Sequence, residues 1–322
     1  MSKERIDYFD YVKGIAILLV IWGHLNYCND NIRMFIYSFH MPLFFIVSGA
    51  LIRYIGIDSD LKKGLIKKFK ALIVPYFTFG ILSILIQLNF SEFNDETFSY
   101  YIKRLLTLQG FDALWFLPSM FFSIIIFMVL KKYIKNDFII AGSCIFLFIV
   151  GLTQNSMESI FLLILFRVFV ALFFIAFGYY LFEVIKKYDV PLSLSIVGMI
   201  IVYFASQYNG DVEIYALQLN NKFIFIFTSL FGTYFLINMF KNEKNNKALL
   251  FLGKNSLLIM LTHQIIIRAF KNYGFVISGH RKMALFLVVI AFIEVPIIFI
   301  VNKFLPFMIG RKYKGSIDKI KG

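Results

Sequence analysis

The chain reads DYVKGIAILLVIWGH over residues 10–24 and FHMPLFFIVSG over residues 39–49. Both stretches are apolar enough to enter a membrane. The first nevertheless carries an aspartate, a lysine and a histidine, and the second carries another histidine. Ionisable groups are costly inside a bilayer and occur mainly where they face a cavity lined by protein. These two segments therefore predict a functional site rather than a plain membrane anchor.

Helical periodicity places the charged groups of the first segment on one side. Lys13 and His24 are eleven residues apart, about three turns of an α-helix and roughly 16 Å along its axis. Asp10 precedes Lys13 by three residues and shares its face. On two antiparallel helices, His24 and His40 can lie at similar depths. Imidazole takes and returns a proton near neutral pH, so His24 and His40 are candidate catalytic residues. Asp10, on the same face as Lys13, is the third candidate.

Each histidine also has a structural explanation. A lone core histidine such as His24 can simply complete the packing. His40 stands two residues before Pro42, which lacks a backbone donor, so it can instead mark a helix kink. Two histidines can also bind a metal, but no carboxylate or cysteine is spaced to supply a third ligand. We therefore expect no metal.

Composition indicates that the whole chain is embedded in a membrane. Apolar residues make up 60% of its 322 residues, against about 45–50% in ordinary soluble domains. A membrane-spanning helix needs roughly 20 mainly apolar residues, and about ten segments meet that length. They are residues 9–28, 36–53, 71–89, 114–131, 138–154, 160–183, 190–207, 223–240, 255–271 and 283–302. The expected fold is an all-α bundle of about ten transmembrane helices, in one domain over residues 1–322.

The net charge of +14 is distributed as membrane topology requires. Of the 33 lysine and arginine residues, 23 lie at the two ends of the chain and in alternate connections, and seven lie in the opposite connections. Basic connections face the cytoplasm, so both termini are expected there, and nucleic acid is not an expected partner. The basic segment 53–70 predicts either an amphipathic surface helix or a topology-setting loop. On the other side, 90–113 and 208–222 predict either substrate-contacting segments or solvated loops.

Four further residues are candidates for substrate contact, each with a structural alternative. Arg167 and Glu294 fall near the middle of their expected spans, where they can bind substrate or pair with each other. Ser48, which precedes Gly49, can contact substrate or form a packing notch of small residues. Trp115 opens the fourth span and suits either a substrate contact or the aromatic belt of a membrane interface.

Several short motifs follow one another along the chain. They are Lys13 and His24 with ten residues between them, the run 39–45 with Ser48-Gly49, Lys67-Lys68-Phe69-Lys70 before Pro75-Tyr76, the runs 114–117 and 177–179, the run 253–257 with His263, and Leu305-Pro306 before Gly310. In these motifs the chain resembles the acyltransferase-3 family of integral-membrane acyltransferases, many of which O-acetylate bacterial surface glycans. The resemblance covers almost the whole chain.

The resemblance implies that the donor and the acceptor approach the protein from opposite sides of the membrane. In that family, acyl-CoA enters from the cytoplasm and the acceptor lies outside. By the resemblance, His24 is the catalytic histidine and Lys13 is the basic member of the paired motif. Acetyl-CoA is then the expected acyl donor, a co-substrate. The residues expected to bind it are Lys13, Lys67, Lys68 and Lys70.

We therefore expect a multi-pass O-acyltransferase, most simply an O-acetyltransferase, of the bacterial cytoplasmic (inner) membrane. It would move an acyl group from cytoplasmic acyl-CoA to a hydroxyl of a cell-surface or secreted polysaccharide or its precursor. Its partners would be acyl-CoA, an extracytoplasmic glycan acceptor and the lipid bilayer, and a homo-oligomer stays open. The alternative is a multi-span exporter of a glycan unit or metabolite. An exporter is expected to show two similar halves, which the sequence does not display.

Overall fold

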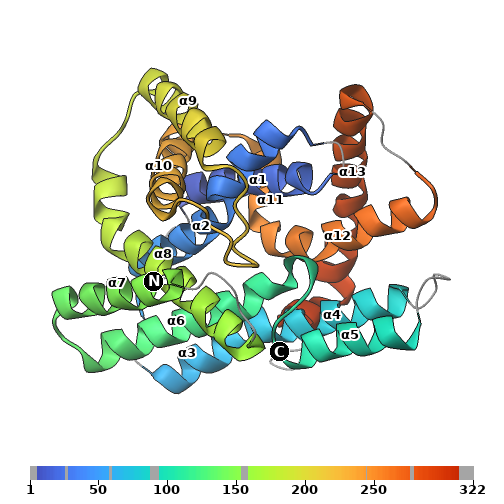
Figure 1. The fold of residues 1–322 in the computed structure, drawn as a ribbon, viewed down its shortest axis with the longest axis horizontal. Coiled ribbons are helices and arrows are strands. Elements are labelled where there is room, and N and C mark those ends of the chain that lie inside the picture. Colours follow the sequence, from blue (N-terminus) through green and yellow to red (C-terminus); the bar gives the residue numbers. More distant parts are fainter. Residues whose placement is uncertain are drawn as a thin grey trace, which may run out of the picture. The chain divides into compact units, whose positions relative to one another are not determined.

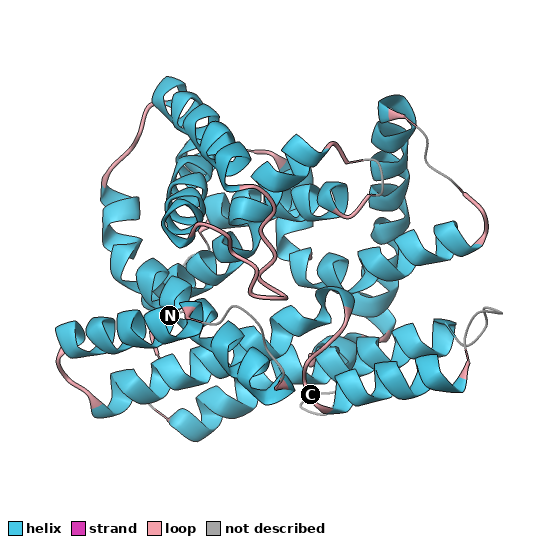
Figure 2. Ribbon diagram, viewed as in Figure 1, coloured by secondary structure: helices cyan, strands magenta, loops and turns pink. Residues whose placement is uncertain are grey.

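The computed structural model describes residues 6–25, 28–57, 60–87, 94–153, 159–243, 245–275 and 279–311. Helices make up the regular structure of these residues, apart from one isolated β-bridge (Figures 1 and 2). The helices are α1 (Asp7–Gly23), α2 (Asp30–Ile55), α3 (Leu61–Lys68), α4 (Val74–Gln87), α5 (Asp95–Leu106), α6 (Phe116–Tyr133), α7 (Asp137–Leu152), α8 (Ile160–Lys187), α9 (Leu192–Asn209), α10 (Lys222–Lys241), α11 (Lys247–Lys254), α12 (Ser256–Asn272) and α13 (His280–Phe304). The prediction of an all-α membrane protein is confirmed for the described residues.

Among the described residues, seven helices are long and apolar enough to cross a membrane, including α2, α8 and α10. One of the seven, Leu61–Gln87, joins α3 and α4 through a π-helical turn at Phe69–Ile73. The pair α11 and α12 is bent by 80° and would make an eighth span if it is counted as one. The remaining expected spans coincide with α1 and α7, which have 17 and 16 residues. The number ten and the cytoplasmic position of both termini stay predictions.

Two connections that the sequence left undecided contain helices. The basic segment 53–70 contains α3, so part of it is helical, and its position on the membrane surface stays a prediction. The segment 90–113 contains α5, which begins where the Asn94 side chain accepts a hydrogen bond from the Thr97 amide. Helix α2 begins at Asp30, earlier than the expected residue 36, and continues through Pro42 as helix.

The described chain divides into two compact units. The first contains Met1–Leu61 and Phe122–Ser256. Within it, α2 packs against α8, α10 and α1, and α1 packs against α11. Where α2 meets α8, a Cβ atom added to Gly49 would clash with the Ile175 carbonyl oxygen, and one added to Gly178 with that of Ile46. The notch of small residues predicted at Ser48-Gly49 is therefore confirmed for Gly49, because only glycine allows this backbone contact.

The second unit contains Lys62–Phe121 and Leu257–Gly322. In it, α4 packs against α5, and the Tyr76 hydroxyl donates a hydrogen bond of 2.9 Å to the Leu105 carbonyl. A short 3₁₀ helix, Pro306–Ile309, ends at Gly310, whose φ of +67° favours glycine. Side chains on α12 and α13 meet polar groups of the same unit, as described below.

Candidate active site

Helix α1 carries an ion pair. The Lys13 ammonium lies 2.8 Å from the Asp10 carboxylate, and both side chains are largely buried. The shared face predicted from the spacing of three residues is confirmed. Asp10 is fourteen residues, about 21 Å of helix, from His24, too far for direct contact between the two side chains. Its backbone is tightly packed as well, because its carbonyl oxygen lies against Gly253 of α11.

The two candidate histidines make the same backbone hydrogen bond. His24 caps the C-terminus of α1, and its Nδ1–H donates to the Val20 carbonyl at 2.8 Å. His40 of α2 donates its Nδ1–H to the Ile36 carbonyl, also at 2.8 Å. A carbonyl can only accept, so in the neutral imidazole the proton sits on Nδ1 and the basic lone pair on Nε2. In each ring Nε2 is the nitrogen that can take a proton from a substrate.

The ring of Tyr37 lies against both histidines. Its centroid is 5.9 Å from that of His24 and 4.9 Å from that of His40. A Cβ atom added to Gly23 would also touch this ring, so α1 is closely packed on it. Sequence reasoning missed Tyr37. The signal was available, because Tyr37 precedes His40 by three residues and therefore shares its face of α2.

The structure gives Arg167 and Glu294 partners within their own units. Arg167 of α8, in the first unit, donates from Nε to the Tyr215 carbonyl at 2.6 Å. Glu294 of α13, in the second unit, accepts hydrogen bonds of 2.8 and 2.7 Å from the Thr262 hydroxyl. Both side chains are buried, with relative exposures of 1%. Direct pairing of Arg167 with Glu294 stays a prediction.

The remaining candidates differ in accessibility. Ser48 is half-buried on α2 of the first unit. In the second unit, the candidate donor-binding residues lie on α3 and the π-helical turn: Lys67 and Lys70 are exposed, and Lys68 is half-buried. Trp115, also in the second unit, is 7% exposed and lies in a 3₁₀ turn, Asp112–Trp115. Its side chain is packed in the protein and not presented on a surface.

A family model described as an acyltransferase domain matches residues 6–309, which include both histidines, Lys13 and the later motifs. The chain belongs to the acyltransferase-3 family. The chain is also 42% identical over 60 residues to the nodulation protein NolL of Sinorhizobium fredii (strain NBRC 101917 / NGR234). That likeness spans 16% of this chain and 16% of NolL, and no solved structure matches the chain.

For an acyltransferase, the helix α1 combines the two groups that the chemistry requires. Transfer to a hydroxyl needs a base that removes the proton as the oxygen attacks. The imidazole of His24, with Nε2 basic, can do this, and His40 on the same tyrosine is the second candidate. At the other end of the predicted span, the Lys13 ammonium can bind an anionic group. Its side chain keeps 19% of its surface exposed.

Proposed function

We propose that this acyltransferase transfers an acetyl group from cytoplasmic acetyl-CoA to a hydroxyl of a cell-surface or secreted glycan, or of its precursor, across the bacterial cytoplasmic membrane. The observation that carries the proposal is the arrangement on α1. A cationic side chain, Lys13, and a base with its lone pair on Nε2, His24, lie on one face about three turns apart. A donor lying along that face would bind with its phosphates at Lys13 and its thioester at His24.

The proposed chemical step needs one base and no covalent enzyme intermediate. Nε2 of His24 takes the proton of the acceptor hydroxyl while the hydroxyl oxygen attacks the thioester carbonyl carbon. The tetrahedral intermediate then expels the CoA thiolate, which takes the proton back from the imidazolium. The products are the acetyl ester and free CoA, so atoms and charge balance. His40 is the alternative base, because it contacts the same tyrosine ring and has the same Nε2 lone pair.

Other candidates keep the roles predicted from the sequence. Lys67, Lys68 and Lys70 would add positive charge for the polyanionic donor on the cytoplasmic side. Ser48 and Trp115 are candidate contacts of the acceptor or the acyl chain. The name of NolL associates that relative with nodulation, but the short alignment supports no particular acceptor for this chain.

The proposal is tested by offering acetyl-labelled acetyl-CoA to the purified protein in lipid. Transfer to a glycan, or slow hydrolysis, supports the enzyme, whereas an intact donor favours the exporter. Surface glycan from cells with and without the gene is compared by mass, and each acetyl ester adds the mass of one acetyl group. The exporter predicts a change in the amount of glycan without a change in its ester content.

The orientation is tested by thiol labelling of intact cells. Both native cysteines, Cys28 and Cys144, are first replaced so that only the introduced cysteine can react. A cysteine in place of exposed Lys63 should be protected from an impermeant maleimide, because the positive-inside rule places α3 in the cytoplasm. Labelling of that cysteine from outside would contradict donor entry from the cytoplasm.

A further inference from the structure

Arg167 is a buried charged residue whose side chain contacts a loop. It lies seven residues, about 10 Å, from the start of α8. Its Nε donates to the Tyr215 carbonyl, and its guanidinium carbon lies 4.2 Å from the centre of the Tyr215 ring. A buried arginine inside a membrane protein is costly and is usually kept for a function. Its contacts indicate that this function concerns the loop at Tyr215.

Tyr215 lies at the turn of an ordered hairpin between α9 and α10, the 210–221 hairpin. Glu213 and Gln218 form an antiparallel bridge with backbone hydrogen bonds of 2.7 and 3.0 Å. Their side chains are exposed and neighbour each other across the bridge. The side chains directed into the protein are Val212, Ile214, Leu217 and Leu219, all buried. The hairpin is therefore packed on the first unit and presents a polar face outward.

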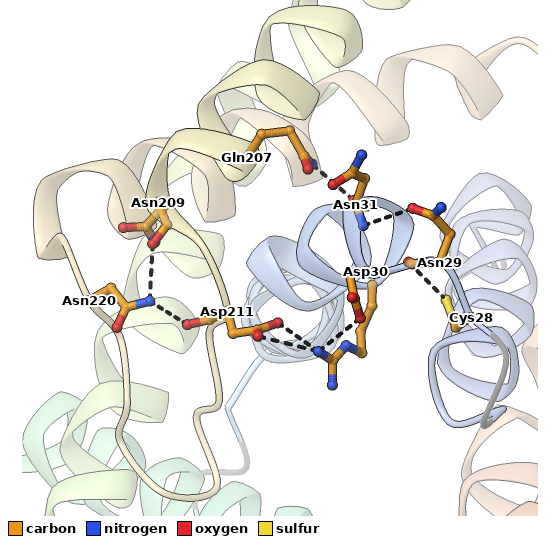
Figure 3. A network of polar contacts seen from close by, with 9 residues as sticks. Cys28, Asn29, Asp30, Asn31, Gln207, Asn209, Asp211 and Asn220 are labelled. Atoms are coloured by element: carbon orange, nitrogen blue, oxygen red, sulfur yellow. Dashed lines mark hydrogen bonds and ion pairs between the residues drawn. The ribbon is translucent and has the colours of Figure 1, made fainter.

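The base of the hairpin is held by asparagine side chains (Figure 3). Asn209, the last residue of α9, accepts from the Asn221 amide at 2.8 Å and donates to the Leu219 carbonyl at 3.3 Å. Asn220 donates to the Asn209 carbonyl at 3.0 Å. These side chains satisfy backbone groups that a free loop would expose to water. Both ends of the hairpin are thus tied to helices, with Arg167 at the tip.

The hairpin is also connected to the helix that carries His40. Arg33 of α2 lies 3.2 Å from the Asp211 carboxylate. Gln207 of α9 donates a hydrogen bond to the Asn31 carbonyl at 2.9 Å (Figure 3). Tyr37 lies four residues, about one turn, further along α2 than Arg33. The ring of the same tyrosine contacts both histidines. Helix α2 therefore joins the candidate bases to the hairpin, through Tyr37 at one point and Arg33 one turn earlier.

We infer that the 210–221 hairpin binds the glycan acceptor, and that Arg167 is the positioning residue that holds its tip. The inference rests on the proposed acetyl transfer. Glu213 and Gln218 supply an exposed carboxylate and an amide, groups that exchange hydrogen bonds with sugar hydroxyls. Arg33 is seven residues, about 10 Å, from His40 along α2. A glycan bound at the hairpin thus has room to extend a further hydroxyl to the histidines.

The test separates the acceptor side from the donor side. Arg167→Lys keeps the positive charge but loses the planar guanidinium. That group donates a hydrogen bond to the Tyr215 carbonyl and lies over the Tyr215 ring. Cells lacking the gene receive wild-type or variant protein at low level, and base-released acetate is measured on their surface glycan. Misplacing the hairpin should lower this acetate about 10-fold or more. Acetyl-CoA binding by the purified variant should stay within about 2-fold of wild type, since distant sites act independently.

Two further variants make the test specific. Arg281→Lys is the matched control, an exposed arginine on α13 in the other unit, and it should leave glycan acetate unchanged. The double variant Glu213→Ala/Gln218→Ala alters only exposed side chains, so it should fold even if Arg167→Lys does not. It should lower glycan acetate about 10-fold with normal donor binding. A cysteine at Gln218 should react faster with an external maleimide when Arg167 is lysine, because the hairpin is released.

The outcomes distinguish a failure of the hairpin assignment from a failure of the proposed acetyl transfer. No ester acetate with the wild-type protein would overturn the proposed function, and the hairpin assignment with it. If the wild-type protein produces ester acetate and both Arg167→Lys and the double variant produce the same amount, the hairpin assignment alone is overturned. Loss of donor binding in parallel with acetate would show that Arg167 and the hairpin only stabilise the fold. Loss of acetate with intact donor binding supports acceptor binding at the hairpin.

Discussion

His24 and His263 make the same hydrogen bond in two different surroundings. Each donates Nδ1–H to a carbonyl four residues earlier, His24 to Val20 and His263 to Ile259. His263 is completely buried in the middle of α12, whereas His24 is half-buried at the end of α1. The tautomer is thus a local property of a helical histidine and does not mark a catalytic one. What distinguishes His24 is its accessibility, and its contact with a tyrosine that also touches His40.

The two histidines should respond differently to the same substitution, and this is the largest effect we expect. Glutamine keeps approximate size and hydrogen-bonding capacity but cannot take the proton. His24→Gln should bind acetyl-CoA normally and lose about 10²–10⁴-fold in single-turnover transfer. His263→Gln, the matched control, should keep transfer within about 10-fold and mainly lower stability, because its bond is structural. Near-normal transfer by His24→Gln would remove it as the base and leave His40.

Substitution of Lys13, in the ion pair at the N-terminal end of α1, should weaken acetyl-CoA binding without slowing the chemical step of transfer. Lys13→Met removes the charge proposed to hold the donor phosphates and also removes the ion pair with buried Asp10. Acetyl-CoA should bind about 10- to 100-fold more weakly, the equivalent of a lost charged hydrogen bond. Lys13→Arg should largely restore binding, since position and charge are kept. Titration calorimetry measures both. Normal donor binding by Lys13→Met with failed turnover would assign the lysine to the chemical step.

Substitution of Tyr37 tests whether the tyrosine ring that contacts both His24 and His40 is what distinguishes His24 from His263. Tyr37→Leu removes the ring that contacts His24 and His40, and displacement of a base typically costs about 10-fold or more in transfer. Tyr37→Phe keeps the ring and should retain transfer within about 3-fold, provided that the ring, and not the hydroxyl, positions the bases. The pH–rate profile should shift with leucine and stay constant with phenylalanine. A profile unchanged by leucine would mean that Tyr37 only fills space.

The smallest effect is expected at Glu294, the polar contact of the second unit. Its carboxylate accepts from Thr262, and the amide oxygen of glutamine can accept the same bond. Glu294→Gln should therefore change the free energy of unfolding by about 1 kcal/mol and leave transfer within about 3-fold. Thermal unfolding and transfer are measured on one preparation. A loss of transfer as large as that of His24→Gln would instead make Glu294 part of the active site.

Much of this protein follows from the sequence alone, because helix geometry is local. A spacing of three residues is enough to pair Asp10 with Lys13, and the structure shows that pair. Long apolar runs are enough to predict an all-α membrane protein, since isolated backbone groups cannot stay unpaired in lipid. The motif order from Lys13 to Gly310 was enough to predict the family, which the match over residues 6–309 confirms.

Contacts between distant segments were decided only by the tertiary structure. Periodicity shows which residues share a face of one helix, but it does not show which helix that face will meet. The meeting of both histidines at Tyr37, and the bond from Arg167 to Tyr215, depend on how helices and loops pack. The crossing at Gly49 and Gly178 has the same origin, because close packing selects the one arrangement in which backbones can touch.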